Sequence, residues 1–292
     1  MMLRLSIGRT VRQIFTVVGL LAGLMWPGSA VIAQQNPSIP SFWDPQEQFI
    51  KPNVKELPRL RFLTTTDFPP FSFIDKDKRL SGFHVDLARA ICSELELLAV
   101  CQIQALPFEE LQTALEEGRG EAIIAGMVAT RSTREALAFS RPYFWLPARF
   151  VARRDTPLQE PLSRGLKDLE VGVVEGTSHA AMASAKFGDL RLRMFDNQDS
   201  ALAALKDKKV SAVFGDGLSL AFWLQSREPD AECCRFVGGP YLSTTYLGSG
   251  LSIAVSKENR QLEEALNYAL RTIDERGTFA ELYLRYFPLG LF

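Results

Sequence analysis

The sequence contains very little histidine and no excess of charge of either sign. Only His84 and His179 occur among its 292 residues, and nothing in the chain has the spacing of a zinc site, a catalytic triad or a phosphate-binding loop. The 33 Lys and Arg residues nearly balance the 34 Asp and Glu residues, giving a formal net charge of −1. A dedicated nucleic-acid binder needs a basic face that displaces counterions. We therefore expect no nucleic-acid partner, no metal and no cofactor.

Long apolar runs are scarce as well. The run at 14–25 is shorter than the ~20 residues that span a bilayer, and the uncharged stretch 236–256 is broken by glycine, proline and hydroxyl residues, which favours turns and strands. Three arginines precede the first run, and small residues follow it up to Ala33. This order predicts a cleaved secretory signal peptide at residues 1–33, and therefore a periplasmic protein. Losing three arginines and no acidic residue would change the net charge from −1 to −4.

The four cysteines would then lie in an oxidising compartment, where disulfides form. Cys92 and Cys101 stand at the end of a helical pattern and at the start of the next strand, close enough in sequence to be joined around a tight connection. This favours a disulfide over two buried thiols. Cys233 and Cys234 are adjacent, and a bridge between them needs a strained peptide geometry. Their state stays open.

Several prolines and little periodicity between residues 34 and 58 predict an extended N-terminal arm that lies on the surface. From Leu60 onward, short apolar runs alternate with amphipathic patterns of helical period. This order is typical of a mostly parallel sheet covered by helices. In this first series we expect strands at 60–64, 103–105 and 122–125 and helices at 85–98 and 108–117.

A second, similar series follows. We expect strands at 171–174, 190–195 and 210–214 and helices at 177–186, 200–206 and 218–225. Two helical patterns, at 261–276 and 279–286, then end the sequence.

Connecting strands at 148–153 and 252–255 would join the two series. The predicted fold class is therefore α/β with two lobes. Lobe 1 would comprise residues 59–149 and 248–292, and lobe 2 residues 150–247. Such sheets bind small molecules beyond the carboxyl ends of their strands and at domain interfaces, which predicts a ligand cleft between the lobes.

The loops after the strands of the first series carry aromatic residues suited to a ligand. Phe68 and Phe71 flank two prolines after the first strand, and we expect Phe71 to cap the core and Phe68 to stack on a ligand. Phe108 follows the second strand, where core packing and ligand contact are equally compatible with the sequence. Gly126 follows the third strand and permits a close backbone approach.

Hydroxyl and guanidinium groups open the next predicted helix. Thr130 and Arg134, with the residues between them, combine hydroxyls, backbone N–H groups and positive charge, which together favour an anion site. A lone Arg would instead be a solvated surface residue.

The second series offers two comparable features. Thr177 and Ser178 follow Gly176 at the start of a predicted helix, where a plain N-cap would account for one hydroxyl but not for the preceding glycine. Asp216 ends a predicted strand between two glycines, where it could bind a ligand cation and also cap the following helix. Two anion-binding elements and one Asp match the α-carboxylate and α-ammonium groups of an amino acid.

Seven segments occur in the order and spacing found in the periplasmic solute-binding proteins of polar amino-acid ABC transporters, the family of glutamine-, histidine- and arginine-binding proteins, which this chain strongly resembles. The segments are DFPPFSF at 67–73, GFHVDLARAIC at 82–92, EAIIAGM at 121–127, FSRPYF at 139–144, VGVVEGTS at 171–178, AVFGDG at 212–217 and GSGLSIAVSKEN at 248–259.

This resemblance implies a type II periplasmic-binding-protein fold, in which two α/β lobes joined by two hinge crossings close on the ligand. Ligand contacts are implied at Phe68, Phe108, Gly126, Arg134, Thr177, Ser178 and Asp216. Arg134 would pair with the α-carboxylate, aided by the second-lobe hydroxyls, and Asp216 would take the α-ammonium. The family also often has a disulfide where Cys92 and Cys101 stand.

The sequence departs from the family pattern at three places. Thr133 stands where the carboxylate-binding arginine commonly lies, so Arg134, one residue later, and Arg131 are both candidates for that role. Val128 replaces a frequent Thr or Ser. His179 occupies a position often held by an uncharged residue, and it could contact a polar ligand or titrate near neutral pH. The identity of the ligand stays open.

Together these features predict a monomeric extracytoplasmic solute-binding protein without catalytic activity. It would capture an amino acid or a related small zwitterion by cleft closure and deliver it to an ABC permease. One alternative is an enzyme on the same scaffold, similar to cyclohexadienyl dehydratases, with Glu175 or His179 as acid or base. Another is a partner protein of a periplasmic redox enzyme that uses the proline-rich arm.

Overall fold

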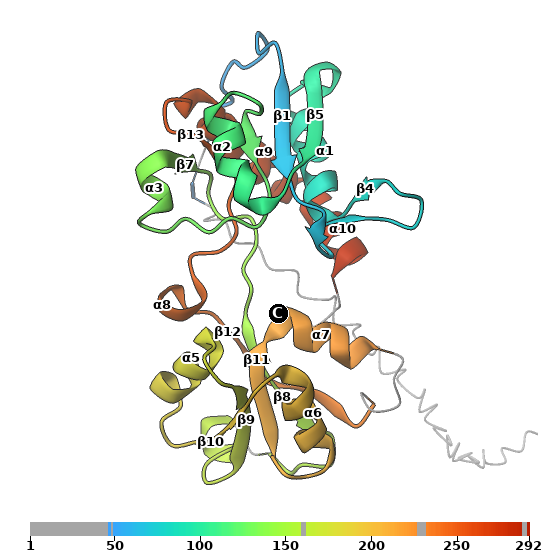
Figure 1. Ribbon diagram of the computed structural model, residues 1–292, viewed down its shortest axis with the longest axis vertical. Helices are drawn as coiled ribbons and strands as arrows, with labels where there is room; N and C mark the ends of the chain where they lie inside the picture. Colours follow the sequence, from blue (N-terminus) through green and yellow to red (C-terminus); the bar gives the residue numbers. More distant parts are fainter. Residues whose placement is uncertain (1–45, 48, 159–161, 227–231, 288–290) are drawn as a thin grey trace, which may run out of the picture. The chain divides into compact units, whose positions relative to one another are not determined.

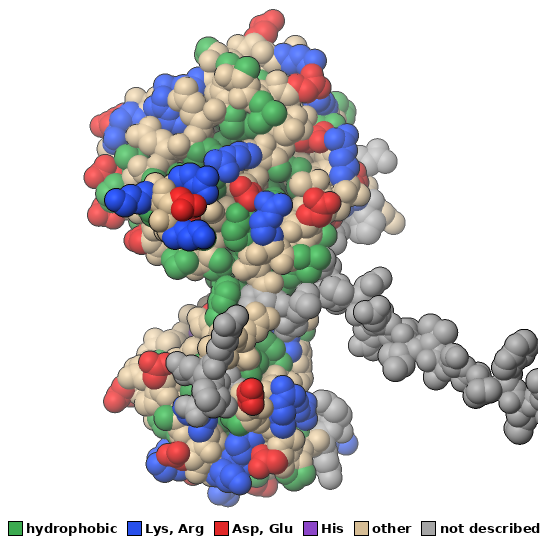
Figure 2. All heavy atoms as spheres, turned by 90° about the vertical axis from the view of Figure 1, so that its right-hand side faces the viewer, with side chains coloured by type: hydrophobic (Ala, Val, Ile, Leu, Met, Phe, Trp, Pro, Cys, Tyr) green, Lys and Arg blue, Asp and Glu red, His purple; other side chains and the backbone are tan. Residues whose placement is uncertain are grey.

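The computed structural model describes residues 46–47, 49–158, 162–226, 232–287 and 291–292. The predicted signal peptide and the first part of the predicted arm, up to residue 45, lie outside these residues. Within the described ranges, no helix has the length and apolar character needed to cross a membrane. On the face shown in Figure 2, basic and acidic side chains are intermixed.

A five-stranded sheet with the order β5-β1-β6-β13-β7 forms the core of the first lobe (Figure 1). β1 runs parallel to β5 and β6, whereas β13 is antiparallel to β6 and β7. Its strands are β1 (Leu60–Thr64), β5 (Cys101–Ala105), β6 (Ala122–Ile123), β7 (Leu137–Phe139) and β13 (Ala254–Ser256).

Helices cover both faces of this sheet because its buried residues alternate between them. Phe62 packs with the helices α1 (Phe83–Glu94), α9 (Arg260–Glu275) and α10 (Thr278–Tyr286), whereas the next residue, Leu63, packs with α2 (Leu111–Glu116). β1 is therefore buried on both of its faces, as expected for a central strand of a sheet that helices cover on both sides.

A second five-stranded sheet, with the order β10-β9-β11-β8-β12, forms the core of the second lobe. Its strands are β8 (Ala148–Arg153), β9 (Glu170–Val174), β10 (Arg191–Phe195), β11 (Ala212–Asp216) and β12 (Cys234–Tyr241). Phe214 packs toward α5 (Ser178–Lys186), and Val213 packs toward α6 (Gln198–Lys206) and α7 (Gly217–Gln225). Short helices α4 (Leu162–Gly165) and α8 (Thr244–Leu247) complete this part.

A small three-stranded sheet follows β1 and holds the first aromatic loop. It consists of β2 (Asp67–Phe68), β3 (Ser72–Ile74) and β4 (Leu80–Ser81), paired antiparallel in the order β2-β3-β4. Phe68 lies opposite Ser72 in this pairing. The backbone of Phe68 is therefore fixed by strand pairing as well as by the two prolines that follow it.

The fold class predicted from the sequence is confirmed, but several boundaries were wrong. The helix expected at 85–98 ends at Glu94, because Leu95 caps it and Glu96 adopts a positive φ of 62°. The helix expected at 108–117 begins as a 3-10 turn, Phe108–Glu110, before α2, and the short helix α3 (Thr133–Ala136) has a single turn. The connecting strand expected at 148–153 is confirmed with the same bounds as β8, which pairs with β11 and β12 in the second sheet.

Disulfides join both cysteine pairs. Cys92 at the end of α1 is bonded to Cys101 at the start of β5, with 6.1 Å between the Cα atoms, as the spacing predicted. Cys233 and Cys234, whose state the sequence left open, also form a bond. The first of these bridges fixes the helix against the strand that follows it.

The described end of the predicted arm contacts the first lobe. Val54 is buried in the core cluster that contains α1 and α9. The ammonium groups of Lys51 and Lys55 pair with the carboxylate of Glu96 at 2.7 and 2.8 Å. Because these ion pairs are exposed, the buried valine contributes more to attaching this segment than the charges do.

Candidate functional site

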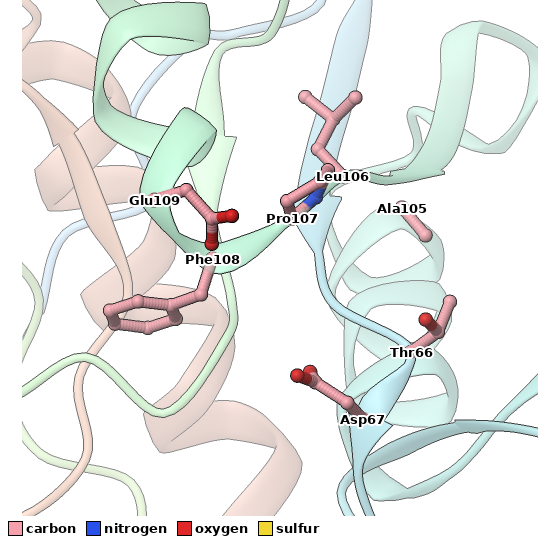
Figure 3. A pocket seen from close by; sticks show the side chains of 7 residues that line it. All are labelled: Thr66, Asp67, Ala105, Leu106, Pro107, Phe108 and Glu109. Atoms are coloured by element: carbon pink, nitrogen blue, oxygen red, sulfur yellow. The ribbon is translucent and has the colours of Figure 1, made fainter.

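Two adjoining pockets lie at the carboxyl ends of the first-lobe strands. Asp67 and Phe108 belong to both. One pocket is completed by Thr65, Phe68, Ala125 and Gly126, and the other, shown in Figure 3, by Thr66, Ala105, Leu106, Pro107 and Glu109. This is the edge at which open α/β sheets bind ligands, so we name the two together the first-lobe site.

Phe68 forms one wall of the first-lobe site. Its ring stacks on that of Phe71, with centroids 4.6 Å apart and planes at 20°. Phe71 itself is fully buried, so it anchors Phe68 to the core. Gly126 closes the same wall with a φ of +78°, and a Cβ atom there would lie 2.5 Å from Cε1 of Phe68. The absence of a side chain at Gly126 therefore allows the Phe68 ring to pack directly against the backbone.

Phe108 presents a half-exposed ring, with 51% of the residue accessible. Pro107 starts the 3-10 turn that carries it, and the ring projects away from Leu106 (Figure 3). A buried core position would hide the ring, so the structure leaves its face open for stacking.

Two carboxylates flank this ring. Asp67 and Glu109 project their carboxyl groups into the same hollow (Figure 3). Neither forms an ion pair within the described part of the chain, and no Lys or Arg is among the residues that line the two pockets. An aromatic face beside two unpaired carboxylates attracts a cation, both through the ring quadrupole and through charge.

Thr65 adds a polar group that sequence reasoning missed. The residue is 2% exposed, lines the pocket beside Gly126, and its hydroxyl has no hydrogen-bond partner among the residues described. Buried hydroxyls are normally paired, so a ligand group is a natural partner. One signal could have indicated Thr65, Asp67 and Glu109, because each lies within four residues of the carboxyl end of β1 or β5.

Thr130 and Arg134 are not among the residues that line these pockets. The Thr130 hydroxyl accepts from the backbone N–H of Thr133 and bonds to the Ser132 hydroxyl at 3.0 Å. The guanidinium of Arg134 lies 5.6 Å from the centroid of the Phe139 ring. Like Arg134, Arg131 is exposed. The structure thus brings Phe68, Phe108 and Gly126 together in the first-lobe site, whereas Thr130 and Arg134 do not line it.

The second-lobe candidates stand at the starts of α5 and α7. Thr177 is the N-cap of α5, where its hydroxyl accepts from Ala180 N at 3.1 Å and donates to Val174 O at 2.7 Å. Ser178 is exposed beside it. The hydroxyl proton of Thr177 is therefore already used, and Ser178 has the more available side chain.

Asp216 caps α7. Its Oδ1 atom accepts from the backbone N–H and the hydroxyl of Ser219, both at 2.7 Å. Burial lowers the pKa of His179, and the negative charge of Asp216 opposes this shift. His179 and Asp216 thus interact electrostatically, and a ligand cation bound by Asp216 would meet this imidazole.

Across the residues that the structure describes, no group of three or more His, Cys, Asp and Glu side chains is arranged to hold an ion.

The chain matches the family described as bacterial extracellular solute-binding proteins, family 3, over residues 60–289. The arginine-binding periplasmic protein of Mannheimia haemolytica is 30% identical over 216 residues, which cover 74% of this chain and 86% of the relative. The ABC transporter arginine-binding protein 1 of Escherichia coli K12 is 29% identical, over 79% of this chain and 91% of the relative.

Solved structures agree on the fold. The L-cystine solute receptor of Neisseria gonorrhoeae, in its unliganded open conformation, aligns with a TM-score of 0.68 and 18% identity, covering 80% of this chain and 94% of that one. At this identity the likeness concerns the two-lobed architecture alone.

Proposed function

The chain belongs to family 3 of the bacterial extracellular solute-binding proteins, and from this premise we propose that its ligand is an α-amino acid with a cationic side chain. The observation that carries this choice is the pairing of the half-exposed Phe108 ring with the unpaired carboxylates of Asp67 and Glu109. The relatives named as arginine-binding proteins support the same ligand class.

The first-lobe site would hold the side chain of the ligand. A guanidinium is planar and weakly hydrated, so it can stack between Phe68 and Phe108 while its edge donates to Asp67. A carboxylate side chain would instead be repelled by Asp67 and Glu109. A neutral amide would lack the charge that these residues favour. The site therefore selects by sign of charge as well as by shape.

The second lobe would bind the α-ammonium group of the ligand. Asp216 is proposed for this role, because Oδ1 is engaged in capping α7 while the charge of the carboxylate stays available. Ser178 and Thr177 would add contacts to the α-carboxylate. Arg134 or Arg131 would neutralise that carboxylate, and for Arg134 this requires leaving the Phe139 ring.

Binding would act through closure of the two lobes. Contacts to both lobes exist only in a closed form, so the ligand shifts the equilibrium toward it by its differential affinity. An ABC permease would then recognise the closed, loaded protein. We further propose that the protein acts as a periplasmic monomer, exported through its N-terminal segment, and that it performs no catalysis.

Isothermal titration calorimetry on the purified protein tests this proposal. We expect binding of L-arginine and L-lysine, with L-glutamine weaker and L-glutamate undetectable. Tight binding of L-glutamate with none of L-arginine would overturn the proposed ligand class. Incubation with prephenate or arogenate is the control for the enzymatic alternative, and aromatic product would contradict a pure binding role.

A further inference from the structure

Leu291 and Phe292, which follow α10, pack into the core of the first lobe. Leu291 is fully buried and belongs to the core cluster that contains α1, α9 and α10. The centroid of the Phe292 ring lies 6.3 Å from that of Phe144 and 6.4 Å from that of Tyr283. Phe144 follows β7 and Tyr283 lies on α10. These two residues are therefore anchored among the aromatic side chains of the first lobe.

Leu291 also contacts elements of the second sheet. Arg149, on β8, donates from Nη1 to Leu291 O at 3.0 Å. A Cβ atom added to Gly217, the first residue of α7, would lie 3.3 Å from Leu291 Cδ1. Leu218 and Ala221 of α7 belong to the same buried cluster as Leu291. Leu291 thus joins β8 and α7 to the core of the first lobe.

Arg149 is itself part of the buried structure at this point. The residue is 7% exposed, and its guanidinium carbon lies 4.3 Å from the centroid of the Phe236 ring on β12. A buried guanidinium needs partners for its charge and its N–H groups. The Phe236 ring and the Leu291 carbonyl are two of these partners. The hydrogen bond to Leu291 is therefore a core interaction, which solvent does not weaken as it weakens a surface contact.

The start of α7 is enclosed by the same groups. The N–H of Gly217 donates to Pro147 O at 2.8 Å, and Pro147 ends the segment that leads from β7 to β8. A Cβ atom at Gly217 would lie 2.6 Å from Pro147 O and 2.9 Å from Arg149 Cγ. Gly217 directly follows Asp216, the residue proposed for the α-ammonium group. These contacts therefore fix the backbone of Asp216 where the chain enters the second sheet.

We propose that Leu291 and Arg149 form a third, noncovalent connection between the lobes, beside the two covalent crossings at 140–147 and 242–253. A single crossing segment permits twisting as well as bending, and a third point of contact beside the first crossing leaves fewer relative orientations of the lobes. Closure on a ligand then costs less conformational entropy, which raises the affinity. The effect on Asp216 rests on the proposed function, whereas the connection itself does not.

The connection is tested without any ligand. All four cysteines of the chain form disulfides, so Thr113→Cys on α2 and Ala185→Cys on α5, both at exposed positions, can be labelled specifically with nitroxides. Pulsed electron paramagnetic resonance then measures the distribution of distances between the two labels. In this background, Leu291→Ala should widen the distribution by about twofold. Leu291→Met conserves the side-chain volume and should leave the width unchanged.

Two further variants separate the connection from a general loss of packing. Leu284→Ala removes the same atoms from a leucine of α10 that is 47% exposed, and it should leave the distribution unchanged. Arg149→Leu removes the hydrogen bond to Leu291 from the side of the second sheet, and it should widen the distribution as Leu291→Ala does. If circular dichroism shows that Leu291→Ala does not fold, Leu291→Val replaces it, with a smaller widening expected.

The effect on binding is measured by calorimetry with L-arginine on the unlabelled proteins. Leu291→Ala should weaken binding by about threefold to tenfold, because closure must then restrict more open orientations. The affinity of Leu284→Ala should match that of the wild type.

Wild-type width in both Leu291→Ala, or its Val replacement, and Arg149→Leu would overturn the connection, even if their melting temperatures fell, because the residues would then only pack the core. A wider distribution with unchanged affinity would overturn the role in binding. A wild-type protein that binds no L-arginine would refute the proposed function, and the distance distributions would still decide whether the connection exists.

Discussion

The ring of Phe68 lies so close to Gly126 that a Cβ atom at residue 126 would sit 2.5 Å from its Cε1 atom. The aromatic wall of the pocket and the backbone after β6 are therefore one packed unit, in which neither partner can change size without moving the other.

We expect Gly126→Ala to be costly for this reason. The methyl group must displace the Phe68 ring, and the φ of +78° is unfavourable for alanine, so the free energy of unfolding should fall by about 2–4 kcal/mol. Urea denaturation measures it. Gly118→Ala is the matched control, since Gly118 has a φ of +70° and nothing within 4 Å of its added Cβ. A similar loss in both variants would show that the contact with Phe68 contributes nothing.

Acid should destabilise the protein through His84. The folded protein keeps this ring neutral down to about pH 3, whereas the unfolded chain protonates it below about pH 6.5. The unfolded state therefore binds more protons between these values, and the free energy of unfolding falls with decreasing pH by up to about 1.4 kcal/mol per unit. His84→Gln should lack this part of the slope in urea titrations between about pH 6 and about pH 4. Parallel curves for the two proteins would contradict the prediction.

Asp67→Asn should weaken L-arginine binding by about tenfold, the loss of one charge-assisted hydrogen bond. Glu109→Gln should also weaken L-arginine binding, and the affinity of this variant should depend less on the salt concentration. Calorimetry at two salt concentrations measures both effects. Glu264→Gln removes an exposed carboxylate on α9 and serves as the control. If all three variants bound equally well, the acidic residues would have no part in ligand selection.

The two roles of Asp216 can be separated. Asn is as good an N-cap as Asp, so Asp216→Asn should keep the bonds to Ser219 and change the free energy of unfolding by less than about 0.5 kcal/mol. Binding of L-arginine should nevertheless fall strongly, because the charge that faces the α-ammonium is lost. Asp216→Ala should lose both the hydrogen bonds that cap α7 and the binding of L-arginine. Tight ligand binding by Asp216→Asn would remove the carboxylate from the site.

Removal of the Cys92–Cys101 bridge by replacing both residues with alanine should lower the free energy of unfolding by roughly 2–3 kcal/mol in the chain-entropy account, with an added cost for the buried Cys92 side chain. The bridge between Cys233 and Cys234 joins neighbouring residues and closes almost no loop. Its double alanine variant should therefore lose only the packing of the buried Cys234 side chain, so its free energy of unfolding should fall less than that of the Cys92 and Cys101 variant. The reverse order in thermal or urea denaturation would contradict this account.

The sequence by itself determined the α/β class, the family and the elements from which the site is built. The alternation of Phe62 and Leu63 across β1 is a local property of the strand, and so are the strand ends that place Phe68, Phe108 and Gly126 at one sheet edge. The role of Asp216 as a helix cap could also be predicted from the sequence, because it depends on Asp216 and Ser219, which are only three positions apart.

Only the tertiary structure decided which polar groups remain for a ligand. Arg134, the sequence's candidate for the carboxylate, has its guanidinium over Phe139, while Thr65, Asp67 and Glu109, which carried no assigned role, line the first-lobe site. The position of the proton on the neutral His84 ring depends on Ile124 O, a carbonyl that directly follows β6. This carbonyl is linked to Nδ1 of His84 through the hydroxyls of Thr64 and Ser72. Local patterns fix which face of an element is buried, but hydrogen-bond direction in a closed interior depends on partners brought together only by folding.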